Sequence, residues 1–362
     1  MILITGASGH IGNVLAALLY QNGYTDLRLM VQGKNTAHIE PYAKEIVRVD
    51  ICDPKAVSEA VKGCTDVFHL AGYIQVDRSN KKRLYDINAG GARNVAQACL
   101  EHGVKRLVYA SSIHALVPVN GGALDESQVE TCGCPSDDYG RSKLQGTKAV
   151  LEACKQGLDA VIVYPTGVIG PFDFRSSLAG TMLQKYMKAP GQTHLYFDGG
   201  YDFVDVRDVA DGLFRAWQMG EKGQGYILAG DRCTLRDMIE TVGRSAGREF
   251  KTVRMPLFVV RAGAAIAPVF YALAGRPPVL TQDTVDLLVS KDKITADKAK
   301  AKLGYASRPV TESLSDAVKW YKERSASGWR SLTKDYFDTL KTNHSGCILF
   351  TYYSQHGLLR GV

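Results

Sequence analysis

The sequence predicts an α/β protein built on a doubly wound parallel sheet, with a smaller domain toward the C-terminus. Three observations support this prediction. Short apolar runs alternate with helical stretches over residues 1–165, a glycine-rich turn follows the first apolar run, and the regular alternation ends after Pro165. Strands that alternate with helices at this spacing pair in parallel, and the helices cover both faces of the sheet.

The alternating elements can be followed in order through the first half of the chain. Apolar periodicity, Pro54 at a first helical position and Gly23 at a helix end mark their bounds. The stretch 202–217 is expected to return to the main sheet and then to form a helix. The predicted strands are 1–5, 26–31, 45–50, 66–72, 104–112 and 159–165, and the predicted helices are 13–23, 54–63, 84–103 and 139–157.

Composition and charge exclude several classes of protein. With 362 residues, 45% of them hydrophobic and 22% charged, the chain has ordinary globular values, which exclude disordered and fibrous classes. The net charge of +7 arises from 44 basic and 37 acidic residues spread along the chain, so a nucleic-acid surface is not predicted. The eight cysteines contain no Cys-x-x-Cys pair, and we expect free thiols in a reducing cytoplasm and no metal site. The start, MILITGASG, does not resemble a secretory signal.

One apolar stretch needs a separate interpretation. Residues 255–275 are long enough to span a bilayer, but Arg261 and Pro268 interrupt them. A helical cap over a hydrophobic substrate is favoured over membrane contact, and stable insertion is not expected.

The first strand leads into a glycine-rich turn with the sequence ITGASGHIG, residues 4–12. Such a turn between the first strand and the first helix lets a pyrophosphate approach the backbone closely, and the start of the helix offers free N–H groups. In this context the motif predicts a dinucleotide site of the Rossmann type. The residues expected to bind the cofactor here are Gly6, Ser8, Gly9, His10, Ile11 and Gly12.

The end of the second predicted strand bears on the choice of dinucleotide. A carboxylate about 20 positions after the glycines would bind the ribose hydroxyls of NAD, but this chain has Gln32 there. Lys34 could pair with the 2′-phosphate of NADP, although it could also be a solvated loop charge. NADP is therefore favoured over NAD. Asp50 and Ile51, at the end of the third strand, are expected to meet the adenine edge.

The segment DDYGRSKLQG places Tyr139 four residues before Lys143. On a helix these two side chains share one face. An ammonium near a phenol lowers the tyrosine pKa from its usual value of about 10, which favours proton transfer to and from a carbonyl oxygen. With 18 tyrosines in the chain, one such spacing is also expected by chance. The rest of the sequence has to decide between the two interpretations.

Taken together, these segments resemble the extended short-chain dehydrogenase/reductase family, the NAD-dependent epimerase/dehydratase superfamily. The resemblance covers about residues 1–323 and keeps the family's order of motifs. The motifs are TGASGHIG (5–12), VDICD (49–53), FHLAG (68–72), YDINAGGARNV (85–95), LVYASS (107–112), YGRSK (139–143), YPTGVIGP (164–171) and FVDVRDVA (203–210).

The resemblance implies a catalytic group of Ser112, Tyr139 and Lys143. Tyr139 would exchange the proton of the substrate oxygen, Ser112 would hydrogen-bond that oxygen, and Lys143 would lower the tyrosine pKa and hold the nicotinamide ribose. His114 and Tyr201 are further candidates for contact with the substrate, although His114 could instead be structural. The remaining cofactor contacts implied are Leu70, Ala71, Gly72, Asn88, Pro165, Thr166 and Val168.

Departures from the family pattern narrow the reaction. Ile113 and His114 replace the Asp-Glu pair of the dehydratases, so removal of water is not expected. Asp202 and Asp205 are expected to repel a nucleotide diphosphate, which argues against a nucleotide-sugar substrate. The apolar stretch resembles the branch with dihydroflavonol reductases and 3β-hydroxysteroid dehydrogenases. The resemblance thus implies an NADP-preferring reductase or dehydrogenase acting on a secondary alcohol, ketone or aldehyde of an apolar molecule. A nucleotide-sugar 4-epimerase with tightly bound NAD and a non-catalytic NADP sensor or scaffold remain alternatives.

Domain organisation and assembly follow from the same pattern. We expect a dinucleotide-binding domain in 1–166, completed by 201–229, and a substrate domain in 167–200 and 230–325. Residues 326–362, which include the strand-like run CILFTYY, have no assigned role. Helices 84–102 and 139–157 carry apolar residues on more than one face, for example Val95, Ala98, Leu144 and Val150. Because members of the family that the chain resembles dimerise through these helices, the resemblance implies a homodimer, although both helices could simply pack on the sheet.

Overall fold

The computed structural model of the chain describes residues 1–74, 80–117, 123–127, 133–188, 193–273, 281–290 and 293–327. Two compact units are distinguished: Met1–Trp320 holds the sheets and nearly all helices described below, and Tyr321–Val362 begins with the end of the last helix. The apolar run CILFTYY lies outside the described residues, so the structure adds nothing to its interpretation.

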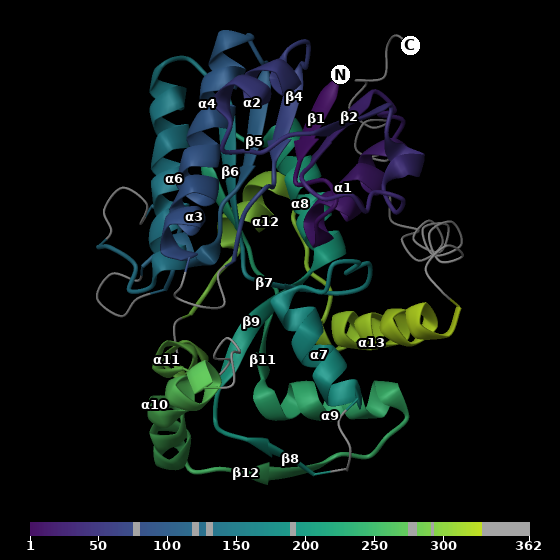
Figure 1. Cartoon of the computed structure of the whole chain (residues 1–362), viewed down its shortest axis with the longest axis vertical. Helices are drawn as coiled ribbons and strands as arrows, with labels where there is room; N and C mark the ends of the chain where they lie inside the picture. Colours follow the sequence, from purple (N-terminus) through teal and green to yellow (C-terminus); the bar gives the residue numbers. More distant parts are fainter. Residues whose placement is uncertain are drawn as a thin grey trace. The chain divides into compact units, whose positions relative to one another are not determined.

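Within the described residues, seven parallel strands form the main sheet of the first unit. Their order is β10-β6-β5-β4-β1-β2-β3, so β1 lies near the middle and the chain winds outward from it in both directions. The predicted doubly wound parallel sheet is therefore confirmed (Figure 1). The strands are β1 (Ile2–Thr5), β2 (Leu27–Val31), β3 (Glu45–Arg48), β4 (Asp66–His69), β5 (Arg106–Ala110), β6 (Ala160–Pro165) and β10 (Gly225–Leu228).

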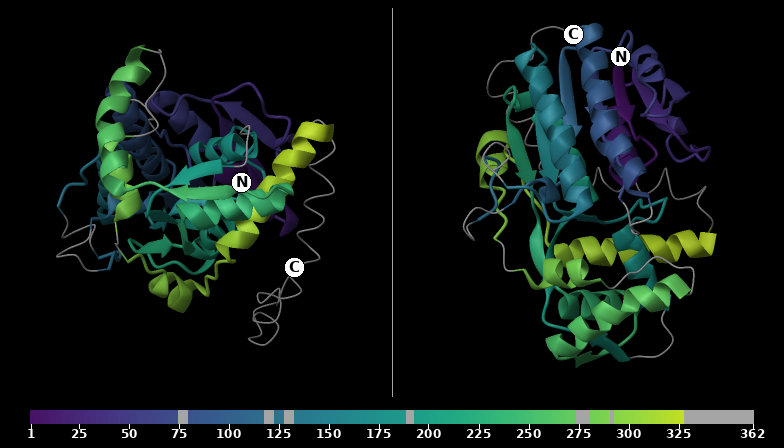
Figure 2. Two further views of the ribbon diagram at one scale, coloured as in Figure 1. Left: turned by 90° about the horizontal axis from the view of Figure 1, so that it is seen from below. Right: turned by 60° about the vertical axis from the view of Figure 1, so that its left-hand side comes forward.

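Helices cover both faces of this sheet (Figures 1 and 2). On one face α4 packs between α2 and α6, and on the other face α8 packs against α1 and α12. Apart from the edge strand β3, the strands between them are mostly buried, which explains their continuous apolar runs. The helices are α1 (His10–Gln21), α2 (Pro54–Val61), α3 (Lys81–Tyr85), α4 (Gly91–Glu101), α6 (Asp138–Lys155), α8 (Val206–Met219) and α12 (Asp297–Leu303).

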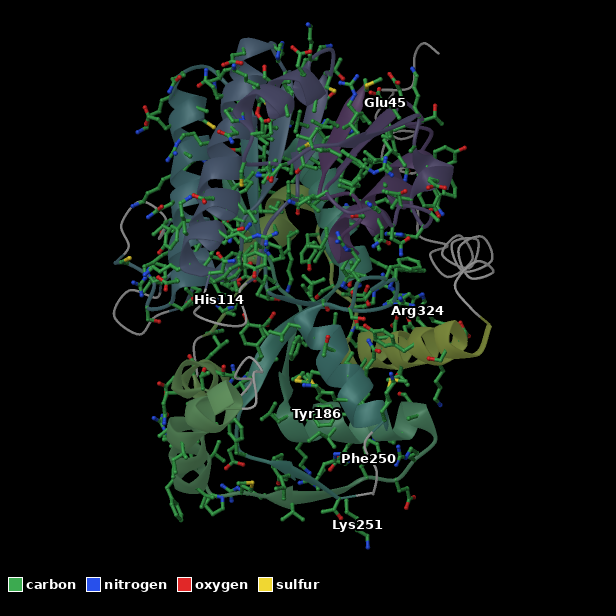
Figure 3. All side chains as sticks on the ribbon, in the orientation of Figure 1. Glu45, His114, Tyr186, Phe250, Lys251 and Arg324 are labelled. Atoms are coloured by element: carbon green, nitrogen blue, oxygen red, sulfur yellow. The ribbon has the colours of Figure 1, made fainter. Side chains whose placement is uncertain are left out.

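Two smaller sheets and the remaining helices follow β6 in sequence. One small sheet has the order β11-β9-β7, and the other pairs β12 with β8 in parallel. Figure 3 labels Tyr186 and Phe250 in this region, where both rings contact the ring of His194. The elements are β7 (Gly167–Ile169), α7 (Leu178–Lys188), β8 (Thr193–Tyr196), β9 (Gly200–Asp205), β11 (Asp231–Thr234), α9 (Leu235–Ala246), β12 (Lys251–Arg254), α10 (Leu257–Leu273), α11 (Gln282–Val289) and α13 (Val310–Ser327).

Short polar side chains define where several helices begin. Asp53 precedes Pro54 and accepts hydrogen bonds from the N–H groups of Lys55 and Ala56 at the start of α2. Asp205 and Thr234 cap α8 and α9 in the same way. These caps satisfy N–H groups that have no partner within the helix, so the helix starts are encoded locally.

Two predicted elements differ from the structure. The long helix predicted over 84–103 is divided, because a π-helical segment, Asp86–Gly90, separates α3 from α4. The stretch expected to re-enter the main sheet instead forms β9, which pairs with β7 and β11, and β10 takes the edge position beside β6. The division into a dinucleotide-binding and a substrate domain stays a prediction, because both parts fall within the same compact unit.

The apolar residues that suggested a dimer are buried within the single chain. Val95 and Val150 are fully buried, and Ala98 and Leu144 nearly so, because α4 and α6 pack on each other. The alternative explanation, packing within the subunit, therefore accounts for these residues. A homodimer stays a prediction without support from them.

The apolar stretch 255–275 forms α10, as the predicted helical cap requires. Val260 and Ala264 pack with Phe197 and Val285 in a small hydrophobic cluster, while Phe258 is 74% exposed. None of the described helices combines the length and the apolar composition needed to cross a membrane.

The close packing of α6 on the sheet leads to a test by paired glycine substitutions. A Cβ at Gly146 would lie 2.5 Å from the Tyr109 hydroxyl and 2.6 Å from the Asn88 carbonyl oxygen, whereas a Cβ at Gly263 on α10 would meet no atom within 4 Å. Gly146→Ala is expected to lower the free energy of unfolding by about 1–3 kcal/mol through overpacking. Gly263→Ala is expected to raise it by up to about 1 kcal/mol through helix propensity. Urea unfolding measures both, and stabilisation by both substitutions would contradict the packing described here.

Candidate active site

The glycine-rich turn forms a cradle at the carboxyl end of β1. Gly6 has a φ of +68°, and a Cβ there would lie 2.8 Å from the N atom of Ala71. A Cβ at Gly12 would lie 2.4 Å from the Gly6 carbonyl oxygen. Helix α1 starts at His10 after Gly9, with neither a side-chain cap nor an acidic residue in its first turn. Its free N–H groups and positive dipole end therefore suit an anionic group, as expected for a dinucleotide pyrophosphate.

Thr5 joins this turn to the segment after β4. Its hydroxyl oxygen accepts hydrogen bonds from the N–H groups of Leu70 and Ala71 at 3.2 and 3.1 Å and lies 2.7 Å from Nδ1 of His69. Burial, followed by the nearby Lys143 charge, lowers the pKa of His69 to about 3, so this imidazole is neutral. The predicted contacts Leu70, Ala71 and Gly72 thus lie beside the glycine turn.

The ends of β2 and β3 lie at the same edge, because β2 pairs in parallel with β1 and β3. Gln32 and Lys34 are exposed just after β2. Ile51 is buried and its carbonyl oxygen accepts a hydrogen bond from Asn94, while the Asp50 carboxylate accepts one from the N–H of Cys52. A role of these residues at the adenine stays a prediction.

Ser112 and Tyr139 meet where β5 ends and α6 begins. Ser112 starts a short 3₁₀ helix, Ile113–Ala115, and its hydroxyl oxygen accepts a hydrogen bond from the N–H of His114. Tyr139 lies in the first turn of α6, near enough for the Ser112 hydroxyl to lower the pKa of its phenol. Asp137 caps this helix by accepting a hydrogen bond from the N–H of Gly140 at 2.8 Å. The structure therefore brings the serine and the tyrosine together as expected.

Lys143 is buried one turn further along α6. Its Nζ donates a hydrogen bond to the Ala110 carbonyl oxygen at 2.7 Å and lies 5.1 Å from the centre of the Tyr109 ring. A Cβ at Gly72 would lie 3.6 Å from this Nζ and 3.4 Å from Oδ1 of Asn88. The lysine, the asparagine and the segment after β4 therefore converge at one place.

Asn88 lies in the π-helical segment, and its amide group is fully engaged. It accepts a hydrogen bond from the N–H of Tyr73 and donates to the Tyr73 carbonyl and to Oγ of Ser142. Ser142 is the neighbour of Lys143 on α6. Asn88 therefore ties the segment after β4 to the helix that carries the tyrosine and the lysine. Such π segments occur often at functional sites.

Burial dominates the ionisation of both central groups. Removal from water raises the pKa of Tyr139 to about 12, against a smaller lowering by the Ser112 hydrogen bond. Removal from water lowers the pKa of Lys143 to about 7. The expectation that Lys143 lowers the tyrosine pKa is therefore wrong for this structure, because burial raises that pKa and the Lys143 ammonium is directed to the Ala110 carbonyl oxygen.

A second group of polar side chains surrounds the tyrosine ring. Nε2 of His114 lies 2.8 Å from the Tyr201 hydroxyl, its Nδ1 lies 3.9 Å from the Asp137 carboxylate, and its ring meets that of Tyr139 edge-on at 5.6 Å. Burial acts to raise the pKa of Asp137, but the nearby His114 imidazole and the hydrogen bond from the Gly140 N–H hold it below its ordinary value. Figure 3 shows His114 beside the end of the main sheet that faces the smaller sheets. His114 and Tyr201 are therefore placed beside the candidate catalytic group.

The segment after β6 contributes Pro165, Thr166 and Val168, which lie at the carboxyl edge of the main sheet and in β7. The two aspartates expected to repel a diphosphate are occupied elsewhere. Asp202 is buried and accepts a hydrogen bond from the N–H of Gly230, and buried Asp205 pairs with Arg207. The expected repulsion of a diphosphate by these two aspartates stays a prediction.

Sequence reasoning missed the segment that follows β7. Nε2 of His10 lies 2.8 Å from the Pro171 carbonyl oxygen, and the Asn13 amide donates to the Phe172 carbonyl oxygen at 3.2 Å. These contacts fasten residues about 160 positions downstream to the start of α1. No spacing in the sequence predicts them, because the contact exists only in the folded chain.

Comparison with known proteins assigns the family. A model described as the NAD dependent epimerase/dehydratase family matches residues 2–229. The chain belongs to this family. The match includes the glycine turn, the Ser112–Tyr139–Lys143 group and all seven strands of the main sheet. The predicted family and the general class of nicotinamide-dependent enzyme are thereby confirmed.

Individual members of the family resemble the chain over most of its length. "Sterol demethylase protein B" of Methylococcus capsulatus is 27% identical over 89% of this chain and 98% of its own. A candidate dihydroflavonol 4-reductase of Synechocystis is 28% identical over 88% of this chain and 94% of its own. The crystal structure of gox2253 superposes with a TM-score of 0.74 at 29% identity and covers 90% of this chain and 98% of that one.

The burial of Lys143 predicts how stability depends on pH. Its side chain loses a proton near pH 7 in the folded chain but near 10.5 when unfolded, so the unfolded chain binds more protons between these values. The free energy of unfolding of the wild type is therefore expected to rise with pH across this window.

Lys143→Met removes this titration. The free energy of unfolding of the variant minus that of the wild type should be largest near pH 7 and should shrink toward about pH 10. Urea unfolding at several pH values measures it, with the exposed Lys148→Met on the same helix as the control. A difference that stays constant over this range would contradict the inferred burial of a neutral lysine.

Proposed function

We propose that the protein is an NADP-dependent reductase or dehydrogenase of a secondary alcohol, ketone or aldehyde in an apolar molecule. The observation that carries the proposal is the convergence of Ser112, Tyr139 and buried Lys143 at the sheet edge that also holds the glycine cradle. A phenol close to a hydroxyl and beside a nucleotide cradle suits proton exchange at a carbonyl oxygen.

The nicotinamide, when bound, supplies or accepts the hydride. Because the pKa of Tyr139 is about 12, its phenol is protonated at neutral pH and can donate its proton to a carbonyl oxygen that gains negative charge. Ser112 can hydrogen-bond the same oxygen. Lys143, with a pKa of about 7, can gain or lose a proton at neutral pH, and its position near Gly72 suits contact with a ribose hydroxyl.

The apolar nature of the substrate is supported by α10 and by the relatives. Phe258 and Ile266 on α10 are 74% and 55% exposed, which leaves apolar surface for a ligand. The names of the two relatives given above refer to a sterol and to a flavonoid compound, both apolar ring systems. Burial of such rings contributes about 25 cal/mol per Å² of apolar area.

A nucleotide-sugar 4-epimerase is the second candidate, because the family description includes epimerases and the aspartates once expected to repel a diphosphate are engaged internally. Such an epimerase would keep its NAD bound from one turnover to the next. Tightly held NAD and binding of a uridine diphosphate would distinguish it from the reductase.

The role of Tyr139 can be tested by removing its hydroxyl group. Tyr139→Phe is expected to reduce turnover at least about 100-fold, because the proton donor is lost. The dissociation constant for NADPH should change less than about threefold, since the ring remains. Tyr20→Phe, at an exposed position on α1, serves as the control. Loss of cofactor binding with turnover retained would reverse the assigned roles.

The substrate class can be tested by a screen that follows NADPH absorbance. We expect oxidation of NADPH with ketones or aldehydes of steroid or flavonoid type and none with nucleotide sugars. Release of NAD from the purified protein on denaturation, together with a raised melting temperature in uridine diphosphate, would instead establish the epimerase.

A further inference from the structure

The segment between β7 and α7, Pro171–Ser177, has an unusual backbone. Phe172 and Ser176 both have positive φ values, +66° and +51°, which side chains other than glycine rarely adopt. Strained residues of this kind persist only where surrounding contacts hold them, and they gather at functional sites. The shape of this segment is therefore imposed by what it contacts.

Several side chains fasten the segment to the start of the nucleotide fold. The contacts of His10 and Asn13 with the carbonyl oxygens of Pro171 and Phe172 hold its first half. The Phe174 ring stacks on the His38 imidazole at 4.5 Å, and Nε2 of that imidazole lies 3.3 Å from the Ser8 carbonyl oxygen. The segment is thus fastened to the start of α1 and, through His38, to Ser8 in the glycine turn.

This arrangement places Arg175 between the glycine turn and the end of β2. Its Nη1 donates a hydrogen bond to Oγ of Ser8 at 3.1 Å, and Ser8 itself is buried. Its Nη2 lies 3.1 Å from the place that a Cβ of Gly33 would occupy. In the part of the chain that the structure describes, no carboxylate pairs with this guanidinium. Arg175 is exposed, so its guanidinium can be reached by a ligand from solvent.

In a sheet of this topology the adenine ribose binds between the glycine turn and the end of β2, and an arginine there accommodates a 2′-phosphate. We propose that Arg175, which lies 167 residues after Ser8, is the side chain that recognises the 2′-phosphate of NADP. A guanidinium can bind a phosphate through two parallel hydrogen bonds, which a lysine cannot do. The inference rests on the proposed NADP-dependent function and names the residue that selects its cofactor.

Lys34 is the residue that the sequence suggested for this role. It is exposed two positions after Gln32, on a loop, and the structure records no contact that orients it toward the glycine turn within the described residues. Arg175 is held at the turn by its bond to Ser8. The structure therefore assigns the specific recognition to Arg175 and leaves Lys34 as an additional positive charge.

The test measures binding and does not depend on turnover. Dissociation constants for NADPH and NADH are determined by fluorescence titration for the wild type, Arg175→Met and Arg175→Lys. Arg236→Met, at an exposed position of α9, is the control. Arg175→Met is expected to weaken NADPH binding at least about tenfold, corresponding to about 1.4 kcal/mol, and to change NADH binding less than about threefold. Arg175→Lys should lie between the wild type and Arg175→Met, and Arg236→Met should match the wild type.

The outcomes separate the inference from the proposed function. Equal weakening of NADPH and NADH by Arg175→Met, or no change in either, would overturn the role of Arg175 and leave the reductase proposal standing. A wild type that binds NADH as tightly as NADPH would also overturn it. A wild type that binds neither nucleotide would refute the proposed function itself. Thermal unfolding of each variant shows whether a change in affinity reflects loss of the fold.

Discussion

The close approach of α6 to the main sheet is the constraint on which the candidate site depends. Gly146 allows it, because a Cβ there would lie 2.5 Å from the Tyr109 hydroxyl, and Gly140 allows the first turn to lie against the His114 carbonyl oxygen. Only at this distance can Nζ of Lys143 reach the carbonyl of Ala110 while Tyr139 meets Ser112. A helix held farther away would leave the same residues in solvent, where neither group would be perturbed.

Burial at this contact sets the protonation states that the chemistry uses. The phenol of Tyr139 is held neutral, and Lys143 titrates near neutrality because water is removed from both. The three hydrogen bonds of the Asn88 amide join the segment after β4 to α6. The site is thus preorganised by backbone and amide contacts, and the shifted pKa values of Tyr139 and Lys143 follow from that packing.

The nucleotide end of the site is built from segments that lie far apart in the sequence. The glycine cradle is local in sequence, but the segment carrying Arg175 comes from the region after the main sheet's sixth strand and returns to the start of α1. Its strained residues, Phe172 and Ser176, mark the point where tertiary contacts outweigh local backbone preference. Residues that recognise the cofactor can therefore lie far in sequence from the glycine-rich motif that predicts its binding.

The sequence by itself determined the doubly wound parallel sheet and the glycine cradle, because alternating apolar runs and glycines at a strand–helix turn act over a few residues. The Ser112–Tyr139–Lys143 group was implied by the resemblance to the family, and its catalytic role stays a prediction. Tertiary structure alone decided three things: the π segment that orients Asn88, the place of β9 in a small sheet, and the position of Arg175 beside Ser8. It also reversed the expected shift of the Tyr139 pKa. The physical reason is the same in each case, since desolvation and contacts between distant segments arise only when the chain has packed.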